Sequence, residues 1–136
     1  MTKDNSPIKA LVLEDDGRRI SAFTKIFYKL KWDYTFYREA KQVIDVLDAG
    51  LIKFDIIFLD HDLGGETYVD TNEKNTGSEV ARWISNNREK VKKIPIIIHS
   101  LNTVGQIYMR NLIPGAHIIP YIWEEDTFKK YVKFRE

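Results

Sequence analysis

The sequence predicts an α/β fold in which five parallel strands form an open, doubly wound sheet with helices on both faces. Short apolar runs such as "IIFL" at 56–59 are continuous rather than alternating, which is typical of strands buried on both faces. The apolar runs are followed by segments whose apolar residues recur at helical spacing. Strand and helix alternate five times along the chain, and this alternation favours a parallel sheet with right-handed crossovers.

The first half of the chain predicts two strand–helix pairs. Asp16 is well placed as the N-cap of the first helix, and Gly50 is a natural stop for the second. The second strand is short and predicted from its aromatic composition. The expected elements are strands over 8–16 and 32–37 and helices over 17–31 and 39–50.

The second half predicts three further pairs and one unusual loop. The polar loop over 64–76 is longer than the few residues that usually join a strand to a helix in such a fold. It can cover a substrate, with Tyr68 available to stack on a base, or it can be a disordered insertion. The expected elements are strands over 53–60, 94–100 and 116–122 and helices over 77–91, 103–113 and 124–134.

Composition narrows the function classes. A chain of 136 residues with a net charge of +1 fits one domain, 1–136, and carries no basic stripe for nucleic acid. The absence of cysteine excludes disulfides, thiolate catalysis and cysteine-bound metals. No signal peptide opens the sequence and no apolar run reaches the roughly 18 residues needed to span a bilayer. We therefore expect a cytoplasmic protein without membrane or nucleic-acid partners.

Polar residues end three of the predicted strands. Asp15 and Asp16 follow the first strand, "DHD" at 60–62 follows the third, and His99 and Ser100 follow the fourth. In a doubly wound sheet the ligand lies beyond the carboxyl ends of the strands. If these strands are neighbours, their polar side chains meet at one edge and form a site.

The acids at this edge favour a metal ion. Carboxylates this close repel one another unless a cation lies between them, and hard oxygen ligands suit Mg²⁺. We expect Asp15, Asp16 and Asp60 to hold Mg²⁺. Alternatively Asp15 and Asp16 only cap the following helix, although one acid would suffice for that and Glu14 makes a run of three.

These residues resemble the receiver domain of response regulators, over nearly the whole chain. The resemblance implies a flavodoxin-like sheet of order 2-1-3-4-5, with Asp15 and Asp16 as metal-holding acids. It also implies that Asp60 is the phospho-acceptor and that the hydroxyl of Ser100 contacts the phosphoryl group. The sequence departs from the pattern near the end of the fifth strand, where receivers carry a Lys and this chain has Ile122.

A narrower resemblance is to the cyclic-phosphate-processing receiver-like family. It is carried by the stretches "LDHDLGG", "TGSEVARWI" and "IIIHSLNTVGQIYMRNLI". That family has Asp-His-Asp after the third strand and His-Ser, with a nearby Asn and Gly, after the fourth. The matching residues are Asp60, His61, Asp62, His99, Ser100, Asn102 and Gly105.

This resemblance gives the histidines an acid–base role. Histidine titrates near neutrality, so His61 and His99 can act as general acid and general base while water splits a cyclic phosphodiester. Mg²⁺ would neutralise the phosphate and help to generate the nucleophile, and Asn102 can donate to the phosphate oxygens. The candidate catalytic residues are Asp60, His61, His99 and Ser100, and the candidate substrate-binding residues are Asn102 and Asp62.

Plainer roles stay open for three of these residues. His61 can be a loop histidine without a task, and Asp62 can orient His61 or cap the loop. His99 precedes Ser100, and because side chains alternate along a strand His99 can point into the core.

Three functions follow from this pattern. The first is a Mg²⁺-dependent protein that acts on a phosphate ester, hydrolysing a cyclic phosphate, with a small phosphate-containing ligand as partner. The second is a receiver phosphorylated on Asp60 in two-component signalling. The third is a module that binds a nucleotide-like ligand without catalysis. A homodimer is a further expectation, because segment 124–134 offers an apolar stripe to a second copy.

Overall fold

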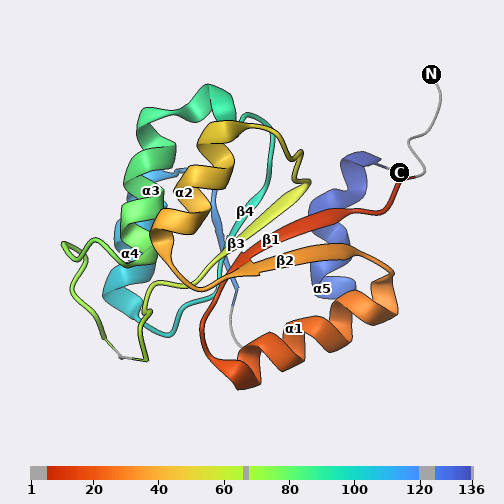
Figure 1. The fold of residues 1–136 in the computed structure, drawn as a ribbon, viewed down its shortest axis with the longest axis horizontal. Helices are drawn as coiled ribbons and strands as arrows, with labels where there is room; N and C mark the ends of the chain where they lie inside the picture. The colour runs from red at the N-terminus through yellow and green to blue at the C-terminus, as the bar shows by residue number, and fades with distance from the viewer. Residues whose placement is uncertain (1–5, 66–67, 120–124, 136) are drawn as a thin grey trace.

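The sheet has the predicted order, β2-β1-β3-β4-β5, with every pair parallel. The computed structural model describes residues 6–65, 68–119 and 125–135 (Figure 1). Its strands are β1 (Lys9–Leu13), β2 (Asp33–Tyr37), β3 (Ile56–Leu59), β4 (Ile96–Ile98) and β5 (His117–Ile118). Its α-helices are α1 (Gly17–Leu30), α2 (Ala40–Ala49), α3 (Gly77–Asn86), α4 (Thr103–Leu112) and α5 (Glu125–Lys129).

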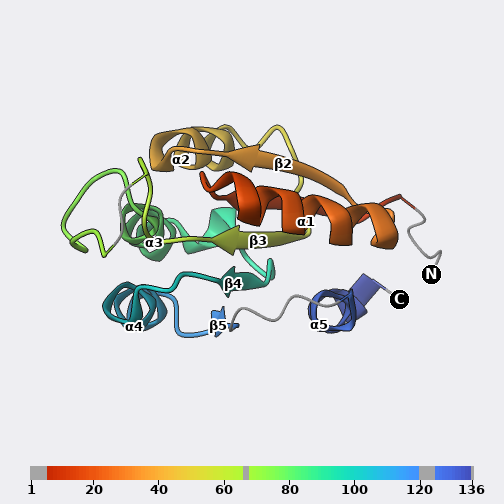
Figure 2. The same ribbon diagram turned by 90° about the horizontal axis from the view of Figure 1, so that it is seen from below.

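Helices cover both faces of the sheet, as the continuous apolar runs predict. Successive residues of β1 point to opposite faces, so Val12 packs with α1 and α5 while Leu13 packs with α2, α3 and α4. In β3, likewise, Phe58 packs with α1 and α5, and Leu59 packs with the other three helices. Figures 1 and 2 show α1 and α5 on one side of the sheet and the other three helices on the opposite side.

Aromatic rings fill the layer between the sheet and the helices α1 and α5. Phe23 lies with its ring centroid 5.7 Å from Phe27, 5.2 Å from Phe58 and 5.8 Å from Phe128. All four rings are fully buried. This packing fixes the position of α1, whose first turn reaches the edge of the sheet where the polar residues lie.

Both predicted helix signals are confirmed. Asp16 caps α1, its carboxylate accepting hydrogen bonds from the backbone N–H groups of Arg18 and Arg19. Gly50 ends α2 in the left-handed conformation, with φ of 65°.

Several predicted elements are shorter in the structure, among them the strands predicted over 8–16, 53–60 and 94–100, which are Lys9–Leu13, Ile56–Leu59 and Ile96–Ile98. The helix predicted over 77–91 ends at Asn86, because Asn87 leaves the helical conformation and its side chain donates to the Trp83 carbonyl; a 3-10 turn, Arg88–Lys90, follows. The last helix changes after Lys129 into a 3-10 segment, Lys130–Arg135, with a kink at Val132. The described part of the fifth strand is His117–Ile118, and Ile122 lies outside the described residues. None of the described helices combines the length and the apolarity that crossing a bilayer requires.

Helix α3 approaches β3 so closely that its first residue must lack a side chain. A Cβ on Gly77 would lie 2.1 Å from the backbone carbonyl oxygen of Asp60 and 2.8 Å from the sulfur of Met109. Gly77 also donates its N–H to the carbonyl of His61, at 3.0 Å. A methyl group would therefore push α3 away from the strand that carries Asp60.

We expect Gly77→Ala to lower the free energy of unfolding by about 2 kcal/mol or more, because backbone atoms cannot move aside as a side chain can. Urea denaturation followed by circular dichroism measures the change. Gly17→Ala is the matched control, since a Cβ there has no neighbour within 4 Å. Equal stability of the two variants would contradict the close packing of α3 on β3.

Candidate active site at the carboxyl edge of the sheet

Three buried residues follow three adjacent strands and meet at the carboxyl edge of the sheet. Glu14 follows β1, Asp60 follows β3 and His99 follows β4. One ligand atom from each of them lies within 4.8 Å of those of the other two. We call these three residues the acidic cluster.

The carboxylate of Glu14 is fully buried and receives hydrogen bonds from several directions. The backbone N–H groups of Asp15 and Asp16 each donate to Oε1 at 3.0 Å. Arg19 donates from Nε to Oε2 at 2.9 Å and from Nη2 to Oε1 at 3.1 Å. The Nε2 of His99 lies 2.8 Å from Oε2. Burial alone would raise the pKa of Glu14, but His99 and Arg19 outweigh it and lower that pKa to about 2.

The carboxylate of Asp60 is held differently. Its Oδ1 accepts the backbone N–H of His61 at 2.8 Å, and its Oδ2 lies 3.3 Å from Nη2 of Arg19. Burial raises the pKa of Asp60 to about 7; the charges of His99 and Arg19 oppose the rise, and the negative charge of Glu14 adds to it. Asp60 therefore changes protonation near neutral pH, in contrast to Glu14.

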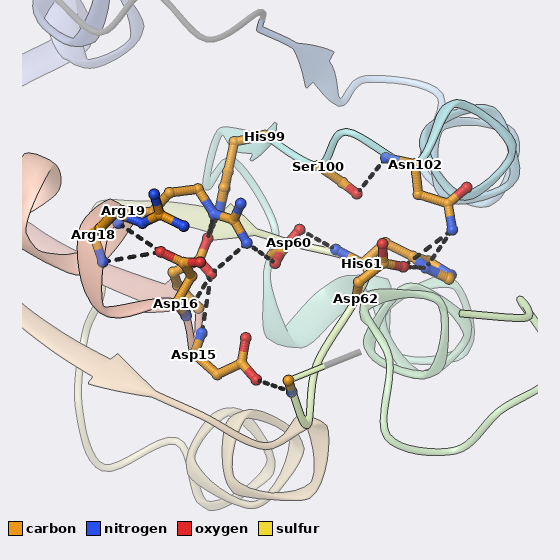
Figure 3. Close-up of polar contacts among 12 residues, drawn as sticks. Asp15, Asp16, Arg18, Arg19, Asp60, His61, Asp62, His99, Ser100 and Asn102 are labelled. Atoms are coloured by element: carbon orange, nitrogen blue, oxygen red, sulfur yellow. Dashed lines mark hydrogen bonds and ion pairs between the residues drawn. The ribbon is translucent and has the colours of Figure 1, made fainter. Parts of the chain in front are cut away.

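The acidic cluster contains one of the three predicted metal ligands, Asp60. Asp60 lies beside Glu14, whereas Asp15 and Asp16, the other two predicted metal ligands, are outside the acidic cluster. Asp16 is used as the helix cap, and Oδ2 of Asp15 accepts the N–H of Gly65 at 3.0 Å (Figure 3). The physical reason is that Glu14 extends the sheet, its N–H bonding to the carbonyl of Tyr37. Its place directly after the strand was the signal that sequence reasoning missed.

His61 lies in a second group of polar residues rather than in the acidic cluster. Its Nδ1 is 3.0 Å from Oδ1 of Asp62, and its Nε2 is 2.8 Å from the hydroxyl of Ser78. The amide of Asn102 donates to the same oxygen of Asp62 at 3.0 Å. We call His61, Asp62, Ser78 and Asn102 the histidine latch. The ring of His61 is fully buried beneath Gly105, where a Cβ would lie 2.5 Å from it.

Hydrogen bonds connect the histidine latch to the long loop over 64–76. Asp62 accepts the backbone N–H groups of Tyr68 and Val69, at 2.7 and 3.0 Å. Burial raises the pKa of Asp62, but hydrogen bonds from His61, Asn102 and these backbone groups lower it overall. Asn102 also donates to the carbonyl of Val69. Asp62 thus both orients His61 and caps the loop, the two roles that the sequence left open.

Asn102 and Ser100 occupy structural positions at the start of α4. Asn102 is the N-cap of that helix and accepts the N–H of Gly105 at 2.9 Å. The hydroxyl of Ser100 accepts the N–H of Asn102 at 3.0 Å, and both residues are buried. Neither side chain reaches the acidic cluster through a described contact.

The two imidazoles pack against helices on opposite faces of the sheet. The His99 ring packs edge-on against Phe23 of α1, with centroids 5.0 Å apart, while His61 packs between α3 and α4. In Figure 3 they lie in separate groups, with Asp60 between them. The arrangement does not place them across one phosphate as a facing acid and base.

An open hollow of about 420 Å³ lies beside the histidine latch. It is lined by the loop and contains Asp70 and Glu73. Among the residues that the structure describes, its charged lining is acidic, so these side chains would repel an anion that entered without a cation. Tyr68 on its rim is 77% exposed.

The sequence matches a family described as the cyclic-phosphate processing receiver domain, over residues 10–114. The chain belongs to this family. No curated protein matches it.

Solved structures similar to this cyclic-phosphate processing receiver domain include receiver domains and a chemotaxis protein. Vibrio cholerae chemotaxis protein CheY4 shares 12% identity with a TM-score of 0.69, over 96% of this chain and 100% of that one. A CheY-like receiver from Methanospirillum hungatei shares 14% with a TM-score of 0.68, covering 96% and 94%. The receiver of a Pseudomonas aeruginosa sensor histidine kinase, solved with a magnesium ion in its active site cleft, shares 14% with a TM-score of 0.66, covering 95% and 97%. At these identities the likeness shows the fold.

The raised pKa of Asp60 predicts a specific pH dependence of stability. Between about pH 4 and pH 7 the folded protein keeps a proton on Asp60 that the unfolded chain releases. Stability therefore falls as pH rises through this window, by at most about 4 kcal/mol. We expect Asp60→Asn to remove this fall, so that the variant gains stability relative to the parent protein from pH 5 to pH 8.

Urea denaturation at pH 5 and at pH 8, with EDTA present, measures the stability of Asp60→Asn relative to the parent protein. Asp45→Asn is the matched control because Asp45 lies on the surface, paired with Lys41. A difference between Asp60→Asn and the parent that stays constant with pH would contradict the raised pKa.

Proposed function

We propose that the protein acts on a phosphate ester, specifically a cyclic phosphate, at the carboxyl edge of the sheet with a divalent cation held by Glu14 and Asp60. The observation that carries the proposal is the acidic cluster: two buried carboxylates and an imidazole brought within 4.8 Å of one another by three neighbouring strands. The family description, cyclic-phosphate processing, supports the choice of substrate class.

The residues present fit Mg²⁺. Carboxylate oxygens are the ligands this ion prefers, and Glu14 and Asp60 supply them from adjacent strands. Asp60 is costly to ionise in its buried position, and a cation beside it would offset that cost. His99, bonded to Glu14, orients that carboxylate. When bound, the cation would neutralise the phosphate and polarise its P–O bonds.

The chain's own residues divide the remaining work. Burial raises the pKa of Asp60 to about 7 when no cation is present, but a cation beside it would favour the ionised form, so its role is to hold the cation as a carboxylate. Arg19 is the cationic side chain in contact with both carboxylates, and its guanidinium can bind phosphate oxygens in the same fork geometry. His61 holds the loop through Asp62, and we propose that its contribution to the reaction is made through that loop.

A second candidate function is signalling by phosphorylation of Asp60. The position of Asp60 directly after β3, in a fold shared with receiver domains, favours it.

The small phosphate-containing ligand is the partner that the first proposal requires. A homodimer through segment 124–134 stays a prediction.

Turnover of cyclic phosphates tests the first proposal. We expect ³¹P NMR to show hydrolysis of 2′,3′-cyclic nucleotides, or of another member of a cyclic phosphate panel, in the presence of Mg²⁺. Glu14→Gln and Asp60→Asn should each lower the rate at least a hundredfold, because each removes a carboxylate that would hold the cation, while Asp45→Asn keeps it. Incubation with acetyl phosphate and Mg²⁺ should label Asp60 only if the signalling function is correct. Absence of turnover across the panel, with labelling at Asp60, would reject the first proposal in favour of the second.

The position of Arg19 leads to a prediction about the affinity of the acidic cluster for a cation. Its guanidinium lies 2.9 Å from Glu14 and 3.3 Å from Asp60, so an incoming cation must share or displace it. We expect Arg19→Gln to raise the affinity for Mn²⁺, measured by calorimetry, about tenfold, since it removes one repelling charge at close range. Arg18→Gln is the control, because that side chain is exposed on the same helix turn. Unchanged affinity in Arg19→Gln would place the cation away from the acidic cluster.

A further inference from the structure

A second concave surface lies at the other end of α1, between the last turns of that helix and the start of β2. This open hollow has a volume of about 630 Å³, which is in the range of small-molecule sites. It is reached by moving along α1 from Arg19 to Tyr28, about 13 Å at the helical rise of 1.5 Å per residue. We call it the α1–β2 hollow. It shares no lining residue with the acidic cluster or the histidine latch.

The floor of the α1–β2 hollow is built from aromatic rings. The ring of Phe27 stacks on that of Trp32, with centroids 5.8 Å apart and planes 21° apart. It also stacks on the ring of Tyr34, at 5.3 Å and 25°. Tyr34 is 40% exposed and Tyr28, which lines the hollow as well, is 83% exposed. Phe27 and Trp32 are buried and hold Tyr34 in place, whereas the exposed rings of Tyr28 and Tyr34 can stack on a flat ligand ring at little conformational cost.

The lining of the α1–β2 hollow carries an excess of positive charge. Lys25, Lys29 and Lys31 line it, against Asp33 as the acid of the same lining. Lys29 lies 3.8 Å from Glu125, but both side chains of that pair are largely exposed, so the pair screens its charge weakly. The lysine stems can cover an apolar ligand while the ammonium groups meet an anion in water.

We propose that the α1–β2 hollow binds a small aromatic anion, that is, a flat ring carrying a carboxylate, sulfonate or phosphate group. The rings supply stacking and the lysines supply charge complementarity. The volume of about 630 Å³ is in the range of small-molecule sites, and three lysines against one aspartate make the lining complementary to an anion. This site is independent of the function proposed for the acidic cluster.

The aromatic sulfonate 1-anilinonaphthalene-8-sulfonate is a suitable probe, because its fluorescence rises on binding to an apolar site. We expect saturable binding with one molecule per chain, and changes in amide NMR shifts confined to the residues around 24–34. Tyr28→Ala should weaken binding at least fivefold, and the double variant Lys25→Gln/Lys29→Gln should do the same. Both changes are on the surface, and circular dichroism checks that the variants fold.

Matched controls separate the site from general stickiness. Tyr68→Ala removes another exposed tyrosine, and Lys53→Gln/Lys74→Gln removes two exposed lysines elsewhere; both should leave the affinity unchanged. The neutral analogue N-phenyl-1-naphthylamine should bind with an affinity that the lysine changes do not alter. Displacement of the probe by adenosine monophosphate or by 2-naphthoate then distinguishes a phosphate-bearing base from an aryl carboxylate. Displacement by neither, shifts centred elsewhere, or equal losses in the control variants would overturn the proposal.

Discussion

The buried carboxylate of Glu14 is the interaction on which the arrangement of the site depends. An ion removed from water costs several kcal/mol unless its hydrogen bonds are supplied by the protein. Here the donors come from the turn after β1, from Arg19 of α1 and from His99 after β4. One carboxylate therefore connects the first strand, the first helix and the fourth strand, and a movement of α1 would remove the paired charge of Arg19 from it. Asp60 lies beside this fixed charge, and the nearby negative charge helps to keep its proton.

The carboxyl edge carries two polar groups with different tasks. The acidic cluster is backed by the aromatic layer under α1, through the contact of His99 with Phe23. The histidine latch is backed by α3 and α4 and holds the loop through Asp62. They meet at the Asp60–His61 peptide, whose N–H donates to the Asp60 carboxylate. Asp60, which carries the titrating carboxyl, is thus followed directly by His61, which holds the loop through Asp62.

Local sequence patterns were enough for the fold because each of them has a local cause. The continuous apolar run at 56–59 requires cover on both faces, and the helical stripes on either side of it provide that cover. Asp16 caps α1 and Gly50 ends α2 because a free backbone N–H group and a left-handed residue are needed at those points. Helix ends such as Asn86 were less predictable, since a single partly buried hydrogen bond from the side chain of Asn87 decides this one.

By itself the sequence determined the parallel sheet and the edge at which the polar residues gather, because hydrophobic period and crossover geometry act over short stretches, and the resemblance to receiver domains implied the strand order. Only the tertiary structure decided which acid joins Asp60 and where each histidine points. Those outcomes depend on distant partners: Glu14 on Arg19 and His99, and His61 on Ser78 and Asn102. A carboxylate or an imidazole looks the same in sequence whether it caps a helix, holds a loop or faces a ligand. The donors that fold against it determine its role.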